Sequence, residues 1–233
     1  MADFPDNGSD YRYERKYVVA KLTVPEVESL IKTHPACFYE IFHARVVSNI
    51  YLDSFGLKSY SDRVNGASSS TKVRIRWYEN LFGYIAKPVL ELKIKRGPLG
   101  RKESFPLRGF LLDNDLKFDV VKDVLLNSNM PDALKSCLSG MEFSIMNSFK
   151  RKYFQSADRK FRLTVDSDIK YYELQNNCNL FLNIVSEPGI TVVEIKYGRK
   201  DDDCAIEITN FLPFRMSRNS KYVNALEKLN LWC

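Results

Sequence analysis

Histidine, phosphate-binding glycine loops and long apolar runs are scarce or missing in this sequence of 233 residues. The two histidines, His34 and His43, form no H-E-x-x-H pattern and no Cys/His cluster with the spacing of a zinc site. The motifs G-x-x-x-x-G-K-[ST], G-x-G-x-x-G and G-x-S-x-G are also absent from the sequence. These absences argue against a zinc hydrolase, a P-loop or dinucleotide-binding enzyme, and a serine hydrolase of the α/β type.

Targeting signals are missing as well. No stretch approaches the ~18 consecutive apolar residues of a membrane helix, and the first ten residues, MADFPDNGSD, lack the basic start and apolar core of a signal peptide. Five cysteines occur without a C-x-x-C pair, which is typical of reduced thiols. The sequence therefore predicts a cytoplasmic protein without a membrane segment of its own.

Composition and organisation indicate one folded unit. Lys and Arg number 35 against 29 Asp and Glu, a formal net charge of +6, and 45% of the residues are hydrophobic, which is enough for a core. We find no internal repeat, low-complexity segment or linker. We therefore expect a flexible N-terminus over residues 1–10 and a single domain over residues 11–233.

Strands dominate the expected elements. Helical spacing after the capping-box pair Thr23 and Glu26 predicts a first helix, and Pro131 divides a later helical stretch into two short helices. The expected helices cover 24–33, 58–64, 116–138 in two parts and 220–229, and the expected strands cover 11–20, 46–52, 72–79, 89–96, 101–107, 142–155, 160–168 and 191–197. Strands with intervening helices indicate an α+β fold.

One face of several expected strands is ionic. Side chains two residues apart share a face of a strand, so KVRIRWY (residues 72–78) has three cations on one side and Val73, Ile75 and Trp77 on the other. Four further stretches alternate in the same way: residues 12–16, 91–95, 162–166 and 194–196. Half-exposed antiparallel strands in water would also alternate. However, bulky apolar residues on the opposite faces need cover, which favours an antiparallel barrel with charges inside and helices outside.

A barrel lined by Arg and Lys requires a ligand. Unpaired buried cations cost several kcal/mol each, so about half a dozen would exceed the ~5–15 kcal/mol stability of a domain. The interior is therefore expected to hold water and an anion, while a few Glu residues among the cations could hold a divalent metal. This combination indicates phosphate chemistry.

Six segments in order resemble the polyphosphate-polymerase domain of the vacuolar transporter chaperone (VTC) family, within the triphosphate tunnel metalloenzymes or CYTH-like proteins. They are YRYERKYVV (11–19), KVRIRWY (72–78), LELKIKRG (90–97), FKRKYFQSADRKFRLTVD (149–166), VVEIKYG (192–198) and SRNSKYVNALEKL (217–229). The resemblance implies an eight-stranded antiparallel tunnel with helices outside. It also implies an ATP-dependent polyphosphate polymerase that transfers the γ-phosphoryl group to a growing chain with Mn²⁺ or Mg²⁺.

The resemblance also implies roles for individual residues. Catalytic positions match Lys16, Arg74, Arg76 and Glu194, with Glu194 as the metal ligand. Further phosphate or nucleotide contacts match Arg63, Lys93, Lys102, Arg151 and Lys221. The implied ligands are ATP, inorganic polyphosphate and pyrophosphate, and because no membrane helix is expected, a membrane-protein partner would have to move the product across a membrane.

Departures from the family pattern leave alternatives. Arg12 stands where the wider superfamily has a first glutamate, leaving Glu14 and Lys16, and this favours a polymerase over a triphosphatase. Phe149 stands where a tyrosine is expected. A hydrolase of tripolyphosphate or an organic triphosphate, and a non-catalytic polyphosphate-binding module, remain alternatives. Nucleic-acid binding is disfavoured because the cations are spread over many strands rather than clustered beside exposed aromatic residues.

Overall fold

The computed structural model describes residues 11–177, 179 and 181–232. Its strands are β1 (Arg12–Val19), β2 (Tyr39–Asp53), β3 (Ser69–Tyr78), β4 (Gly83–Ile85), β5 (Val89–Arg96), β6 (Leu99–Pro106), β7 (Phe110–Leu112), β8 (Glu142–Gln155), β9 (Phe161–Glu173), β10 (Ile184–Glu187) and β11 (Thr191–Gly198). Its helices are α1 (Val24–Lys32), α2 (Lys58–Val64), α3 (Phe118–Leu126), α4 (Asp132–Ser139), η1 (Arg199–Asp201), α5 (Asp202–Asn210) and α6 (Lys221–Lys228). The N-terminus expected to be flexible, residues 1–10, lies outside the described residues.

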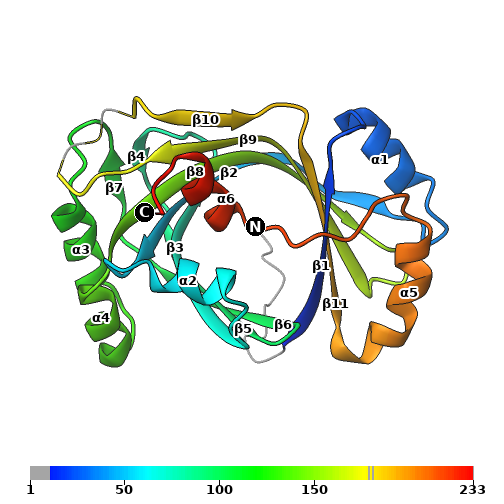
Figure 1. The fold of residues 1–233 in the computed structure, drawn as a ribbon, viewed down its shortest axis with the longest axis horizontal. Coiled ribbons are helices and arrows are strands. Elements are labelled where there is room, and N and C mark those ends of the chain that lie inside the picture. Colours follow the sequence, from blue (N-terminus) through cyan, green and yellow to red (C-terminus); the bar gives the residue numbers. More distant parts are fainter. Residues whose placement is uncertain (1–10, 178, 180, 233) are drawn as a thin grey trace.

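Eight strands close into a ring. They are hydrogen-bonded in the order β9, β11, β1, β6, β5, β3, β2, β8, and β8 pairs back onto β9. Every pairing in the ring is antiparallel, and the shortest joins β1 to β6 through two residue pairs. In Figure 1, β1 and β11 form the right side of the ring, β5 and β6 the lower side, and β8 and β9 the upper side. The predicted α+β fold with eight antiparallel strands is confirmed.

Strand register places the ionic residues on the inner face. Lys16 is opposite Glu194 between β1 and β11, and Arg151 is opposite Asp166 between β8 and β9. On β3, Arg74 is opposite Glu91 of β5. Val73 and Ile75 alternate with Arg74 along this strand, so their side chains point outward. They are fully covered in the largest apolar cluster. The predicted inversion, with charges inside and apolar residues outside, is confirmed.

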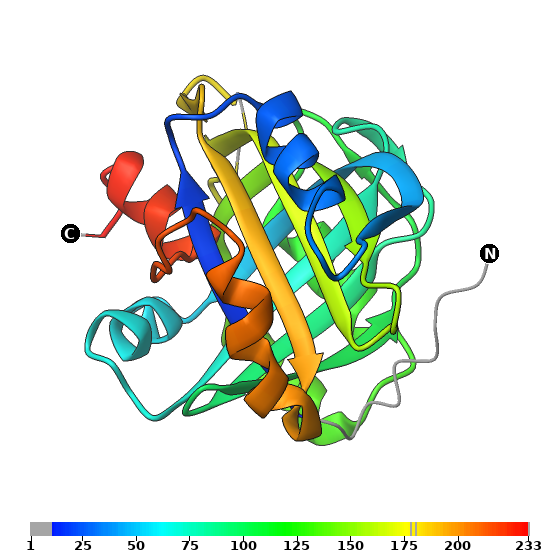
Figure 2. The same cartoon turned by 90° about the vertical axis from the view of Figure 1, so that its right-hand side faces the viewer.

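Helices and a small strand pair cover the apolar outside of the ring. Around β3 and β5, the covering residues come from α3, α4, β4 and β7; they include Ile85, Phe110, Leu112, Phe118, Val121, Val124, Leu125 and Leu138. A second cluster lies over β1, β9 and β11, where Val27 and Ile31 of α1 and Ala205 of α5 are buried. Figure 2 shows α1 and α5 on the outer side of these strands. Each of these two apolar clusters on the outer face of the ring is thus shielded from water by its own set of helices or short strands.

α6 covers part of the inner face instead. Its residues Tyr222, Ala225 and Leu226 form a cluster with Val47, Tyr51, Ile145 and Phe149. These four strand residues lie on the same face as Asn49 and Arg151, because they are an even number of positions away from them. Ser220, the residue before α6, caps the helix by accepting a hydrogen bond from the amide of Val223. The cap fixes the start of α6, and with it Lys221, at the ring interior.

Elements with strong patterns were predicted closely, and short or irregular ones were missed. Helices 24–33 and 58–64 and strands 89–96 and 142–155 match α1, α2, β5 and β8 within one residue. The strand expected at 46–52 is part of β2, which begins at Tyr39, because shifts in register interrupt the alternation of its first half. The elements β4, β7 and β10 have three or four residues, too few for a period to be recognised. The helix α5 (DDCAIEITN) was also missed, since its apolar side is weak.

The helices in the described part of the chain are short, with at most nine residues. None of them has the length and apolar character that crossing a membrane would require.

The inverted core predicts a large cost for shortening Ile75. This side chain is 0% exposed on the outer face of β3, so Ile75→Ala should lower the free energy of unfolding by about 2–5 kcal/mol. Val120→Ala is the control, because Val120 on α3 is 48% exposed and should change stability by less than about 0.5 kcal/mol. Urea unfolding measures both. Equal, small effects in the two variants would contradict a core outside the ring.

Candidate functional site

Glu91 gathers three of the predicted phosphate ligands. Its carboxylate is 2.6 Å from Arg74 Nη2, 3.5 Å from Arg76 Nη1 and 3.1 Å from Lys102 Nζ. Burial alone would raise the pKa of Glu91, but Arg76, Arg74 and Lys102 hold it well below its usual value. Arg76 Nε also donates to Asn49 Oδ1 at 2.8 Å. The residues predicted from KVRIRWY on β3 and Lys102 on β6 therefore converge at one buried carboxylate.

Glu14 and Glu194 form a second acidic centre on β1 and β11. Lys93 Nζ is 2.6 Å from Glu14 Oε2, Lys16 Nζ is 3.8 Å from Glu194 Oε2, and Lys196 Nζ is 3.2 Å from Glu194 Oε1. Burial tends to raise both carboxyl pKa values, but the lysines prevail: the pKa of Glu14 falls to about 2 and that of Glu194 lies well below its usual value. Both carboxylates are therefore ionised at neutral pH.

Asp166 joins the middle of the chain to its end. It accepts hydrogen bonds from Arg151 Nε at 2.5 Å and Nη2 at 2.7 Å, and from Lys221 Nζ at 2.5 Å. The Phe149 ring lies under both cations, with its centroid 5.1 Å from the Arg151 guanidinium carbon and 4.5 Å from Lys221 Nζ. Asp166 is fully buried, which tends to raise its pKa, yet Arg151 and Lys221 lower it to about 2. Arg151 and Lys221, predicted separately, thus share a partner.

Arg63 lies apart from these three centres. It is on α2 and acts electrostatically on Lys72 of β3 and Lys95 of β5, whose pKa values are lowered chiefly by burial and then by neighbouring cations. Lys72 Nζ also donates to Ser220 Oγ at 2.6 Å, next to the start of α6. Arg63 therefore belongs to a cationic group at one end of β3 rather than to a carboxylate centre.

Cations outnumber carboxylates across the site. At the three carboxylate centres and the adjoining end of β3, four carboxylates (Glu14, Glu91, Asp166 and Glu194) lie among ten cations: Lys16, Lys72, Arg74, Arg76, Lys93, Lys95, Lys102, Arg151, Lys196 and Lys221. This excess lowers the cost of bringing in a polyanion and raises the cost of leaving the site without one. The arrangement is suited to phosphate groups, which accept several Arg and Lys hydrogen bonds.

Lys16 shows the effect of this excess on an individual group. Burial, together with the nearby cations Lys93 and Lys221, lowers its pKa to about 8 even though Glu194 and Glu14 act in the opposite direction. Its ammonium also donates to the carbonyl oxygen of Asn219 at 3.2 Å. A bound anion would therefore favour the protonated form of Lys16.

The acidic centre also fits a divalent metal ion in part. The hydroxyl of Thr164, the cross-strand neighbour of Glu194, is buried without a hydrogen bond, and Glu194 Oε1 is buried without one as well, with the ammonium of Lys196 3.2 Å away as an ion pair. Carboxylate and hydroxyl oxygens are ligands of Mg²⁺ and Mn²⁺. Among the described residues there is no group of three or more His, Cys, Asp or Glu side chains that could enclose a metal. The site therefore suits an ion that takes its remaining ligands from phosphate and water, as Mg²⁺ commonly does.

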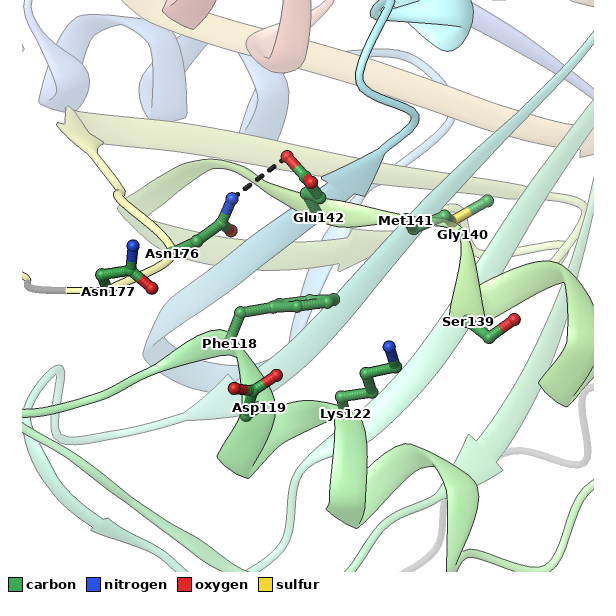
Figure 3. A pocket seen from close by; sticks show the side chains of 9 residues that line it. All are labelled: Phe118, Asp119, Lys122, Ser139, Gly140, Met141, Glu142, Asn176 and Asn177. Atoms are coloured by element: carbon green, nitrogen blue, oxygen red, sulfur yellow. Dashed lines mark hydrogen bonds between the residues drawn. The ribbon is translucent and has the colours of Figure 1, made fainter.

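A separate pocket of about 290 Å³ lies outside the ring, between α3, the end of α4 and the start of β8. Figure 3 shows Asp119 and Lys122 on α3, and Asn176 donating to Glu142. With one lysine and two carboxylates in its lining, this pocket lacks the excess of cations that a polyphosphate requires. The ring interior is the better candidate for phosphate chemistry.

Several interior residues were not predicted as site residues. Glu91, Asp166, Lys72 and Lys196 lie on strands whose alternation was recognised, at the parity of the predicted ligands. Extending the alternation to every charged residue of those strands would have found them. Asn49 could not be found in this way, because the segment VVSNIYL (residues 46–52) has no charged residue that would distinguish the inner face of the strand from the outer one.

The pKa of Lys16 predicts pH-dependent anion binding. Lys16 has a pKa of about 8, so it is mostly protonated at neutral pH and loses its proton as the pH rises through this value. Its contribution to tripolyphosphate affinity should therefore be lost as the pH rises, by about tenfold per pH unit above the pKa. Lys16→Arg should weaken this dependence, because arginine stays charged. Calorimetric titrations from about pH 7 to about pH 9 measure the effect.

Lys228→Arg is the matched control for Lys16→Arg, since Lys228 is exposed on α6 and pairs with Glu187. It should follow the wild-type pH profile. Identical profiles for Lys16→Arg and the wild type would show that Lys16 does not face the bound anion.

Solved structures with a similar fold cover nearly the whole chain. A putative adenylyl cyclase from Hippeastrum, described as having a dominant triphosphatase activity, has a TM-score of 0.51 and 15% identity over 93% of this chain and 95% of its own. A putative adenylate cyclase from Bacillus halodurans has a TM-score of 0.51 and 16% identity, with 91% and 96% covered. A conserved hypothetical protein from Pyrococcus furiosus has a TM-score of 0.51 and 14% identity, with 92% and 99% covered. At these identities the likeness shows the fold.

The search of curated proteins found no match. The sequence model of the VTC domain, in contrast, matches residues 11–230, which contain every strand of the ring and all four carboxylates of the site. This chain therefore belongs to the VTC domain family.

Proposed function

We propose that the protein is an ATP-dependent polyphosphate polymerase, which transfers the γ-phosphoryl group of ATP to a growing inorganic polyphosphate. The observation that supports this most is the gathering of ten cations and four ionised carboxylates on the inner face of one ring. Membership of the VTC domain family supports it independently. The implied ligands are ATP, inorganic polyphosphate and pyrophosphate.

Phosphoryl transfer makes limited demands on the protein. Its transition state spreads negative charge over the oxygens of the transferred group, so catalysis depends on positioning and charge stabilisation. Arg74 and Arg76 would hold the phosphoryl oxygens, and Lys16 would hold the neighbouring phosphate beside Glu194. Arg151 and Lys221, fixed by Asp166, would align the attacking terminal phosphate. A divalent cation, Mn²⁺ or Mg²⁺, would neutralise phosphate charge when held by Glu194.

The remaining predicted ligands fit supporting roles in this scheme. Lys93 pairs with Glu14 and Lys102 pairs with Glu91 on the inner face of β5 and β6. There the two lysines would contact phosphate groups of the chain next to the transferred one. Arg63 would meet phosphates at the end of the ring near Lys72.

A triphosphate hydrolase is the second candidate. The Hippeastrum protein of similar fold is described as a triphosphatase, and a hydrolase would use nearly the same phosphate contacts. Arg12 at the start of β1 favours the polymerase, because an arginine there removes a carboxylate that could support a second metal and activate water.

The surroundings of the enzyme are part of the same proposal. We propose a single domain over residues 11–233 in the cytoplasm, with a membrane protein as a partner if the product is exported. Exposed free thiols at Cys37, Cys137 and Cys204 support a reducing compartment.

Incubating the purified protein with ATP and Mn²⁺ or Mg²⁺ tests the activity directly. Long polyphosphate on a gel, sensitive to an exopolyphosphatase, is the expected result. Release of phosphate from ATP or tripolyphosphate without polymer would show a hydrolase. Binding of polyphosphate without either product would show a binding module.

Glu194→Gln should separate metal-dependent turnover from phosphate binding. The amide has nearly the shape of the carboxylate but lacks the charge that holds a cation. We expect turnover at limiting Mn²⁺ to fall by about tenfold to a hundredfold, the range seen when groups that support a metal site are removed. Tripolyphosphate affinity should be kept or increased.

Glu103→Gln is the control for Glu194→Gln, because Glu103 lies on the same ring but pairs with Arg101 on the outer face. It should leave turnover unchanged. Wild-type turnover in Glu194→Gln at limiting Mn²⁺ would remove Glu194 from the metal site.

Ligand-induced stabilisation tests whether distant residues share one anion. A ligand that binds the folded state at a hundredfold excess over its Kd stabilises it by about 2.7 kcal/mol, so tripolyphosphate should raise the Tm by several degrees. Sodium chloride of equal ionic strength should not. The shift should shrink in both Arg74→Ala and Lys221→Ala and persist in Lys228→Ala. A response lost in only one of the first two variants would contradict a shared ligand.

A further inference from the structure

Arg45 on β2 is enclosed by three aromatic rings. Its guanidinium carbon lies 5.0 Å from the ring centroid of Phe42, 4.8 Å from that of Tyr78 and 4.7 Å from that of Tyr153. We call these four residues the Arg45 cluster. They come from β2, β3 and β8, three consecutive strands of the ring. Contacts of this kind hold a guanidinium in a fixed orientation.

The cluster continues the cationic inner face at one end of the ring. Arg45 is the cross-strand neighbour of Arg151, and Tyr78 and Tyr153 follow Arg76 and Arg151 by two residues, so they share their face. The Tyr153 phenol is also within the electrostatic influence of Arg151, Arg45 and Arg76. Lys72, beside Arg63, lies at the opposite end of β3 from Tyr78.

Arg45 differs from the other interior arginines in its partners. Arg74, Arg76 and Arg151 each pair with Glu91 or Asp166. Within the part of the chain that the structure describes, Arg45 pairs with no carboxylate, and its buried Nε has no hydrogen bond. Aromatic faces stabilise the positive charge, but they do not satisfy the N–H donors of a guanidinium in its own plane. The Arg45 guanidinium therefore has N–H donors that an oxygen acceptor could satisfy.

We propose that Arg45 binds a phosphate group of the polyphosphate chain at the end of the ring, beyond the centre where phosphoryl transfer occurs. This inference rests on the proposed function and adds a binding position that the family resemblance did not supply. Tyr78 follows Lys72 by six positions along β3, which corresponds to about 20 Å at ~3.3 Å per residue. A triphosphate occupies only part of this length, whereas a longer chain can contact the central cations and Arg45 at the same time. Arg45 therefore selects for chain length.

Binding measurements with inorganic phosphates of two lengths test this assignment without catalysis. The probes are tripolyphosphate and a size-selected polyphosphate with tens of phosphates, titrated into the wild type and Arg45→Met. Methionine keeps an unbranched apolar chain among the rings while removing the charge and the donors. The longer chain should lose about tenfold or more in affinity, as expected for a hydrogen bond to a charged group. Tripolyphosphate affinity should change less than about twofold.

Arg101→Met is the matched control. Arg101 also stacks on an aromatic ring, that of Tyr11, and has a buried Nε without a hydrogen bond, but it alternates with Lys102 and points away from the interior. The substitution Arg101→Met removes the same charge from the protein as Arg45→Met. It should leave the affinities for tripolyphosphate and for the longer polyphosphate unchanged. Arg45→Lys, which keeps a cation among the rings, should retain most of the preference for the longer chain, and it serves if Arg45→Met does not fold.

The outcomes separate this inference from the proposed function. An equal loss for both probes would show that Arg45 only supports the central site, and no loss for either would show that it binds no phosphate; each overturns the inference. A wild type that binds neither probe overturns the inference and the proposed function together. A wild type that prefers the longer chain through Arg45 but makes no polymer supports the inference and contradicts the polymerase.

Discussion

The excess of buried cations on the inner face is the constraint on which the rest of the structure depends. Four ionised carboxylates cannot neutralise the surrounding lysines and arginines, so the interior is stable only when water or an anion shares it. The carboxylates act as fixed points: Glu91 orients Arg74 and Lys102, and Asp166 orients Arg151 and Lys221. Because these cations are already positioned, little side-chain entropy is lost when a phosphate binds.

The architecture outside the ring follows from the same constraint. A ring whose inner face is polar has to find its hydrophobic stabilisation on the outer face, and there the apolar residues need cover from water. The covers are α3 and α4 with β4 and β7 over one side, and α1 and α5 over the other. The helix α6 packs on the inner face instead, and it places Lys221 against Asp166. Function and stability therefore use opposite faces of the same strands.

The fold and much of the site could be predicted from the sequence, because the alternation of charged and apolar residues along a strand is a local signal. The ionic faces of KVRIRWY and LELKIK were enough to predict the inversion, and every predicted phosphate ligand except Arg63 contacts one of the four carboxylates. Which acid holds which base was not predictable, since Lys93 meets Glu14 and Arg151 meets Asp166 only through ring closure and register. The Arg45 cluster was also missed, because register shifts between Glu40 and Arg45 break the alternation there.

The arginines and lysines of the ring interior differ in how strongly their charge depends on a bound ligand. Burial tends to lower the pKa values of Arg74 and Arg151, but Glu91 and Asp166 outweigh it and raise them further, so these groups stay charged whether or not a ligand is bound. Burial lowers the pKa of Lys16 and Lys72, with nearby cations adding to the effect, so their charge depends on what the ring contains. A phosphate that enters the ring therefore meets arginines that are always charged, and its negative charge raises the pKa values of the lysines, so that they take up protons from solvent. This coupling lets the interior tolerate its own charge without a ligand and still bind a polyanion.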